Sequence, residues 1–81
     1  MENKKHPVTE VLELHLQRYL DDLGDVPPTN VYEMVVASIE KPMLCLIMKH
    51  AHENQSLAAQ YLGINRNTLR KKLLEHGLIP K

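Results

Sequence analysis

The chain has 81 residues, 43% of them hydrophobic, and its formal net charge at pH 7 is zero. A chain this short forms one small domain that buries little surface alone, and oligomerisation is a usual remedy. Zero net charge argues against a uniformly basic surface for binding nucleic acid. The start Met1–Lys5 lacks the apolar core of a signal peptide, and the single Cys45 cannot form an internal disulfide. We therefore expect a cytosolic protein that crosses no membrane.

The charges are unevenly distributed along the chain. Residues 1–50 carry five Lys/Arg against eight Asp/Glu, a net charge of −3, whereas residues 51–81 carry five against two, a net charge of +3. A local positive segment is the electrostatic feature expected of a nucleic-acid contact. The C-terminal part is therefore the candidate for such a contact.

A first helix is predicted from Val8 to Leu23, where apolar residues recur at helical spacing. Thr9 is a candidate cap at its start and Gly24 a candidate stop at its end. The preceding residues are polar and are expected to fray. The two prolines within residues 24–29 predict a loop after the helix.

A second helix is predicted from Val31 to about Ala51, because Asn30 with Glu33 has the form of a capping box. Pro42 removes one backbone hydrogen bond, so it either kinks this helix or divides it in two. Almost no polar face remains between Met43 and Met48, and such a stretch must be buried on nearly every side. We predict that a second copy of the chain covers it, with a dimer core formed by Val35, Ile39, Met43, Leu46 and Ile47.

Residues 54–77 have the pattern of a helix-turn-helix. Asn54 can cap a short helix, Gly63 supplies a permissive backbone for the turn, and Asn65 can cap a second helix that ends near Gly77. The small pair Ala58–Ala59 would let the two helices approach closely. The apolar residues expected to form the core between them are Leu62, Ile64, Leu69 and Leu73.

The outer face of the second helix of this pair is polar and basic. Arg66 and Arg70 lie one turn apart, and the planar fork of arginine matches the O6/N7 edge of guanine, so both are predicted to contact bases in the major groove. Lys71 and Lys72 are better suited to phosphates. The alternative is a merely structural helical hairpin whose basic face is only solvated.

The run L-G-I-N-R-N-T-L-R-K-K-L resembles the DNA-binding segment of the factor for inversion stimulation (Fis) family of bacterial nucleoid-associated proteins. The resemblance continues upstream through N-V-Y-E-M-V-V-A-S-I-E-K-P-M-L and covers about residues 8–81. It implies an all-α fold with four helices per chain, an intertwined homodimer core and a C-terminal helix-turn-helix, with the proline inside one long kinked helix. The expected division is a short flexible N-terminus at 1–7, dimerisation helices at 8–51 and a DNA-binding module at 52–81.

The resemblance further implies a homodimer that binds and bends duplex DNA, regulates transcription and organises the nucleoid. In that family the two recognition helices are separated by less than one DNA turn, so the DNA must deform between them. Leu74 and Glu75 stand where the most studied members carry basic residues, which predicts a smaller bend or weaker binding. The family's DNA-contacting positions correspond to Asn54 and Ser56 for flanking phosphates and to Asn65, Arg66, Thr68, Arg70, Lys71 and Lys72 for the groove and its walls.

Members of the family that stimulate DNA inversion do so through a mobile N-terminal β-hairpin arm. Here Met1–Pro7 precede the first predicted helix, and they span at most about 25 Å when extended. They contain no alternating apolar pattern or turn pair that would hold two strands together. We therefore expect this chain to bind DNA without activating an invertase of that kind.

Other chemistry is not indicated by the sequence. A metal site is not expected at His50, His52 and Glu53, because residues two apart on a helix point in different directions and the spacing does not suit a tetrahedral site. Cys45 lies in the most apolar stretch, where it is expected to fill the core rather than act as a nucleophile. No phosphate-binding loop or nucleophile elbow occurs. We therefore predict no enzyme, cofactor, metal or small-molecule substrate. A rival interpretation, suggested by the acidic first half, is a helical dimerisation or adaptor module that binds a protein partner without useful DNA affinity.

Overall fold

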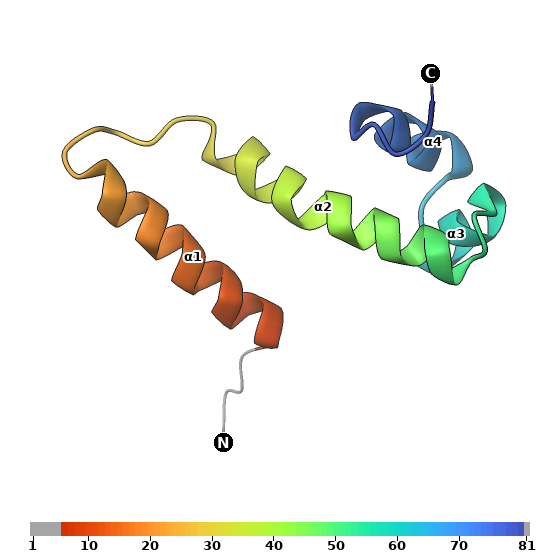
Figure 1. Cartoon of the computed structure of the whole chain (residues 1–81), viewed down its shortest axis with the longest axis horizontal. Helices are drawn as coiled ribbons and strands as arrows, with labels where there is room; N and C mark the ends of the chain where they lie inside the picture. The colour runs from red at the N-terminus through yellow and green to blue at the C-terminus, as the bar shows by residue number, and fades with distance from the viewer. Residues whose placement is uncertain (1–5, 81) are drawn as a thin grey trace. The chain divides into compact units, whose positions relative to one another are not determined.

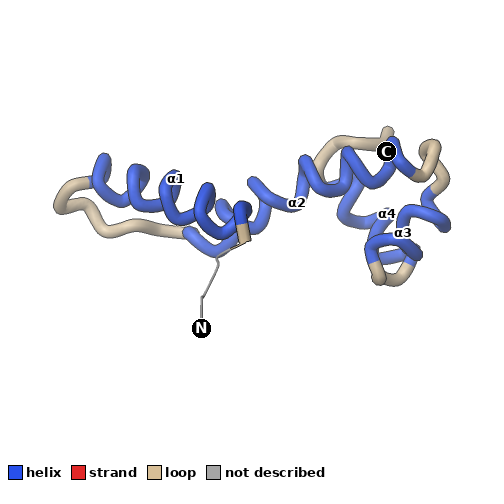
Figure 2. Tube along the Cα trace, turned by 90° about the horizontal axis from the view of Figure 1, so that it is seen from below, coloured by secondary structure: helices blue, strands red, loops and turns tan. Residues whose placement is uncertain are grey.

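The computed structural model describes residues 6–80, which form four α-helices joined by loops, with no strand among them (Figure 1 and Figure 2). The helices are α1 (Pro7–Leu23), α2 (Val31–His50), α3 (Gln55–Leu62) and α4 (Arg66–Glu75). The predicted all-α class and the four helices are thus confirmed. None of these helices is long and apolar enough to cross a membrane.

The chain divides into two compact units, and the boundary between them falls between residues 31 and 32. Helix α1 belongs to the first unit. It begins at Pro7, one residue before the predicted start, because proline suits the first helical position and His6 caps the helix. The Nδ1 atom of His6 accepts a hydrogen bond of 3.1 Å from the Val8 N–H. The prediction that Thr9 caps this helix is therefore wrong. The remainder of the predicted N-terminal segment, residues 1–5, lies outside the described residues.

No residue of α1 is buried, although the helix carries many apolar side chains. Val8, Val11 and Leu14 are each more than half exposed, at 53%, 57% and 58%. This unit therefore shows no apolar core of its own among the described residues.

Helix α2 runs through Pro42 without a break, so the alternative of two separate helices is wrong. Its start does not use the predicted capping box, because Asn30 has a φ of 53°, in the left-handed region, whereas a capping residue is normally extended. Within the described part of the chain, no hydrogen bond joins the side chain of Asn30 to the Glu33 N–H, or the side chain of Glu33 to the Asn30 N–H. The predicted capping box is therefore wrong, although the helix begins at Val31 as predicted.

The connection from α2 to α3 is a tight turn with two consecutive left-handed residues. His52 and Glu53 have φ values of 56° and 63°. A non-glycine residue in this conformation costs roughly 1–2 kcal/mol. The turn is held by a hydrogen bond of 2.8 Å from the Glu53 N–H to the Met48 carbonyl, which satisfies one of the free carbonyls at the end of α2.

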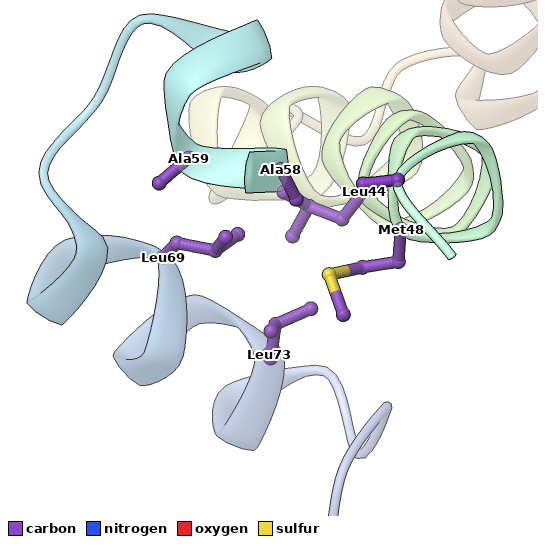
Figure 3. Packing of buried hydrophobic residues seen from close by; sticks show 7 residues of the cluster. Leu44, Met48, Ala58, Ala59, Leu69 and Leu73 are labelled. Carbon is purple, nitrogen blue, oxygen red and sulfur yellow. The ribbon is translucent and has the colours of Figure 1, made fainter. Parts of the chain in front are cut away.

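The apolar core lies where α2, α3 and α4 meet, in the second unit (Figure 3). Side chains from all three helices point toward one another, and the partly buried Leu62 and Ile64 pack against them. The predicted burial of Leu69 and Leu73 is confirmed, since both are 0% exposed. The core also takes residues from α2, within the segment predicted to serve dimerisation. Its buried members are Leu44, Met48, Ala51, Ala58, Ala59, Leu69 and Leu73.

Candidate functional site

Local hydrogen bonds define the helix-turn-helix as the sequence predicted. The Asn54 side chain accepts a 3.0 Å hydrogen bond from the Leu57 N–H and caps α3. Gly63 ends α3 with a φ of 75°, a conformation that glycine adopts without strain, and its N–H donates to the Ala59 carbonyl at 2.9 Å. Asn65 then caps α4. The chain thus turns from α3 into α4 in three residues, 63–65.

The orientation of α4 follows from its two leucines. Leu69 and Leu73 lie one turn apart on the same face, and both are completely buried against α2 and α3. The remaining side chains of the first two turns are consequently directed toward solvent. Arg66, Asn67, Thr68, Arg70 and Lys71 are all exposed, and we call this set the basic face of α4.

Four of the eight predicted DNA-contacting residues belong to this face. Asn54 and Ser56 are exposed at the start of α3, and Asn65 is exposed at the start of α4. The two asparagines use their Oδ1 atoms as helix caps, which leaves their amide N–H groups as donors. All eight predicted residues except Lys72 are exposed.

Lys72 differs from the rest because it is paired within the chain. Its Nζ atom lies 2.7 Å from Oε2 of Glu40 on α2, and the lysine side chain is only 33% exposed. The hydrogen bond to Glu40 raises the pKa of Lys72 above its ordinary value of 10.5. Glu40 therefore competes with any phosphate for this ammonium group, and a DNA contact by Lys72 remains a prediction.

The second oxygen of Glu40 is used as well. Oε1 lies 2.8 Å from Nε2 of His76, just beyond the end of α4. The hydrogen bonds from Lys72, first, and from His76 hold the pKa of Glu40 below its ordinary value of 4.5. Sequence reasoning did not find this cluster, because 32 and 36 residues separate Glu40 from its two partners and no local pattern connects them.

The residues predicted to form the dimer core lie along α2 and are incompletely covered within one chain. Ile39, Met43 and Leu46 are 39%, 42% and 66% exposed, and Val35 is half-buried. Ile47 differs, since it packs partly against the core shared with α3 and α4. A row of exposed large apolar side chains on one helix is the kind of surface that a further protein chain covers.

His50 and Cys45, as a candidate metal ligand and a candidate nucleophile, both lie against other side chains of the second unit. The ring of His50 lies 5.8 Å from that of Tyr61, joining the end of α2 to α3. Cys45 is half-buried and lines a hollow of about 140 Å³ together with Met48 and Leu78. Within residues 6–80, no group of three or more His, Cys, Asp or Glu side chains is arranged to hold a metal ion.

Comparison with known proteins places this helix-turn-helix among bacterial regulators. Residues 35–76 match the family described as bacterial regulatory protein, Fis family. A Fis-like DNA-binding protein of Ralstonia nicotianae is 52% identical over 75 residues, which are 93% of this chain and 97% of the relative. A Fis-like DNA-binding protein of Neisseria meningitidis serogroup A is 44% identical over 89% of this chain and 91% of its own length. The DNA-binding protein Fis of Glaesserella parasuis is 46% identical over 89% of this chain and 74% of its own length.

Proposed function

The chain belongs to the Fis family of bacterial regulatory proteins, and on that premise we propose that it binds duplex DNA through α3 and α4. The observation that carries the proposal is the basic face of α4, which is exposed because Leu69 and Leu73 on the opposite side are buried. In a helix-turn-helix the second helix enters the major groove and presents its N-terminal residues to base edges. Here those residues begin with Arg66.

The proposed roles of the side chains follow from their chemistry. Arg66 and Arg70 read guanine edges by bidentate hydrogen bonds, and Lys71 contacts phosphate as a point charge. Thr68 and the amide of Asn65 contact the walls of the groove. Asn54 and Ser56 contact flanking phosphates from the start of α3, whereas Lys72 is paired with Glu40 and is assigned no DNA contact in this proposal.

We further propose that the protein acts as a homodimer. The row of exposed Ile39, Met43 and Leu46 on α2, which half-buried Val35 continues, supports this, because contiguous exposed apolar surface is unusual on a monomer. A two-fold dimer presents two copies of α4, which enter adjacent major grooves and require the DNA between them to deform. Such a protein bends DNA, regulates transcription and helps to organise the nucleoid. Residues 8–51 then serve dimerisation and residues 52–81 carry the DNA contacts.

A gel-shift titration with mixed-sequence duplex at low salt tests this proposal. We expect saturable binding that weakens steeply with salt, because lysine and arginine contacts to phosphate release counterions. The double variant Arg70→Ala, Lys71→Ala removes two exposed charges from the basic face and should reduce binding at every salt concentration. The matched control is the double variant Lys41→Ala, Lys49→Ala, which removes two exposed charges from α2. Absence of binding by the unmodified chain would favour the adaptor interpretation instead.

A further inference from the structure

Glu40 pairs with two side chains of the helix-turn-helix at once. Its carboxylate oxygens pair separately with Lys72, at 2.7 Å, and with His76, at 2.8 Å. The side chain of Glu40 is 17% exposed and that of His76 is 13% exposed. An ionised carboxylate only accepts hydrogen bonds, so the donor in this hydrogen bond is the Nε2–H group of His76. The three side chains form what we call the Glu40 clamp.

The clamp lies beside the apolar core, one turn away along α2. Glu40, Leu44 and Met48 follow one another at intervals of four residues, so they lie along one face of α2. Leu44 and Met48 meet the buried leucines of α4, while Glu40 meets Lys72 and His76 one turn farther along. Two contact points spaced along α2 define the placement of α4 better than the core alone.

The two kinds of contact constrain α4 differently. Apolar packing has no preferred direction, and α4 inserts only Leu69 and Leu73 as fully buried side chains. Charge-assisted hydrogen bonds are short and directional, and two of them from one carboxylate to side chains four residues apart fix the rotation of the helix about its own axis. Any such rotation would carry Arg66 and Arg70 around with it.

We propose that Glu40 is a positioning residue for DNA reading: through Lys72 and His76 it sets the rotation of α4 and hence the direction in which Arg66 and Arg70 project. The inference rests on the proposed DNA binding and extends it to a residue outside the helix-turn-helix. It also assigns Lys72 to the clamp rather than to a phosphate. Base recognition is sensitive to such rotation, because a bidentate guanine contact requires both N–H groups to be aligned with the base edge.

The test compares Glu40→Ala with Glu33→Ala. Glu33 lies on α2, is exposed, and lines the same hollow of about 250 Å³ as Glu40, so its removal also deletes an acidic group near α4 but does not open the clamp. Both variants are checked for helix content and denaturation midpoint. Their affinities are then measured for a duplex selected by the unmodified protein from a random pool, and for mixed-sequence duplex.

We expect Glu40→Ala to weaken binding to the selected duplex and so to lower the ratio of its affinity to that for mixed-sequence duplex by about five-fold or more, the lower end of what one guanine contact contributes. A lower ratio that came only from tighter binding to mixed-sequence duplex would reflect the release of Lys72 to phosphate and would overturn the inference. Glu33→Ala should leave the ratio unchanged. A purely structural role of Glu40 would instead reduce both affinities equally, by lowering the folded fraction. Should Glu40→Ala not fold, Glu40→Gln, which keeps the size but offers one acceptor oxygen, replaces it with the same expectation.

A second readout concerns Lys72. The slope of log affinity against log salt concentration should be the same for Lys72→Ala as for the unmodified chain, whereas Lys71→Ala should reduce it by about one. An equal reduction by Lys72→Ala, or an unchanged ratio in a folded Glu40→Ala, overturns this inference and leaves the proposed function standing. Failure of the unmodified chain to bind any duplex overturns the proposed function and this inference with it.

Discussion

The side-chain Oδ1 atom of Asn65 accepts a hydrogen bond of 2.7 Å from the backbone N–H of Asn67 at the start of α4. This N–H is one of the groups that a helix leaves without an internal partner. The same residue has an extended backbone, with a φ of −69° and a ψ of 143°, which stops the turn from continuing as helix. One side chain therefore determines where α4 begins.

Asn65→Ala removes this cap and should lower the free energy of unfolding by about 1 kcal/mol. The measurement is urea denaturation followed by circular dichroism, at one protein concentration for all variants. Asn67→Ala is the matched control, because it changes an exposed side chain in the same turn and keeps the backbone N–H that the cap receives. Equal effects of the two substitutions would contradict the assigned cap.

Leu73→Ala should destabilise the protein by about 2–5 kcal/mol, because the side chain is completely buried among α2 and α3 and its removal leaves a cavity. Leu74→Ala deletes the same atoms one residue later, where the side chain is only half-buried, and should cost clearly less. Thermal and urea unfolding of the two variants measure the difference. If Leu74→Ala were the more damaging, α4 would be packed through another face.

Arg66→Ala and Arg70→Ala should each weaken binding to a preferred duplex by about 1–3 kcal/mol and relax the base preference at one position. Both side chains are exposed, so the fold should be retained. Selection from a random duplex pool before and after each substitution measures the preference. Lys71→Ala serves as the comparison, since loss of a phosphate contact weakens all sequences alike. Unchanged preference in both arginine variants would refute their proposed roles.

Leu46→Asp should convert the proposed dimer to a monomer. Leu46 is 66% exposed within one chain, so the substitution leaves the core of that chain intact, but it would bury an unpaired carboxylate at an interface along α2. Ile47 is less suitable, because it also packs against the core of its own chain. Sedimentation measures the state, with Lys41→Asp as an exposed control on α2. A folded monomer formed by the unmodified chain across the concentration range would rule out the dimer.

The Glu40 clamp predicts a dependence of stability on acid pH. Because Lys72 and His76 lower the pKa of Glu40 from 4.5 in the folded state, the unfolded chain binds more protons between the two pKa values, and stability rises with pH there. The contribution is fully present above pH 4.5 and is lost as the pH falls through the folded value. Tyr32, Glu33 and Glu75 are the other titratable groups around the clamp.

Glu40→Gln should therefore flatten the decline of unfolding free energy below pH 4.5 relative to the unmodified protein. Glu33→Gln, which changes an exposed carboxyl group on the same helix, should not flatten it. Urea unfolding in a series of buffers from neutral to strongly acid pH measures both. Parallel curves for Glu40→Gln and the unmodified chain would show that the ion pair contributes nothing measurable.

The helix-turn-helix could be predicted residue by residue because its determinants are local. Asn54 accepts from an N–H three residues later, Asn65 from one two residues later, and Gly63 adopts its left-handed backbone within the turn itself. Such interactions join residues that are neighbours in the chain, so the order of amino acids specifies them directly. The basic face followed from the same periodicity, once Leu69 was assigned to the inner side.

Tertiary structure alone decided which surface of α2 those helices would cover. The sequence shows that the stretch from Met43 to Met48 is apolar nearly all round. Only packing shows that Leu44, Met48 and Ala51 join the core with α3 and α4 while Met43 and Leu46 stay exposed. The clamp is likewise invisible in the sequence, since Glu40 resembles any other acidic residue on a helix. Contacts across 32 and 36 residues depend on how whole helices are placed against one another, and that placement results from the summed burial of many side chains rather than from any local pattern.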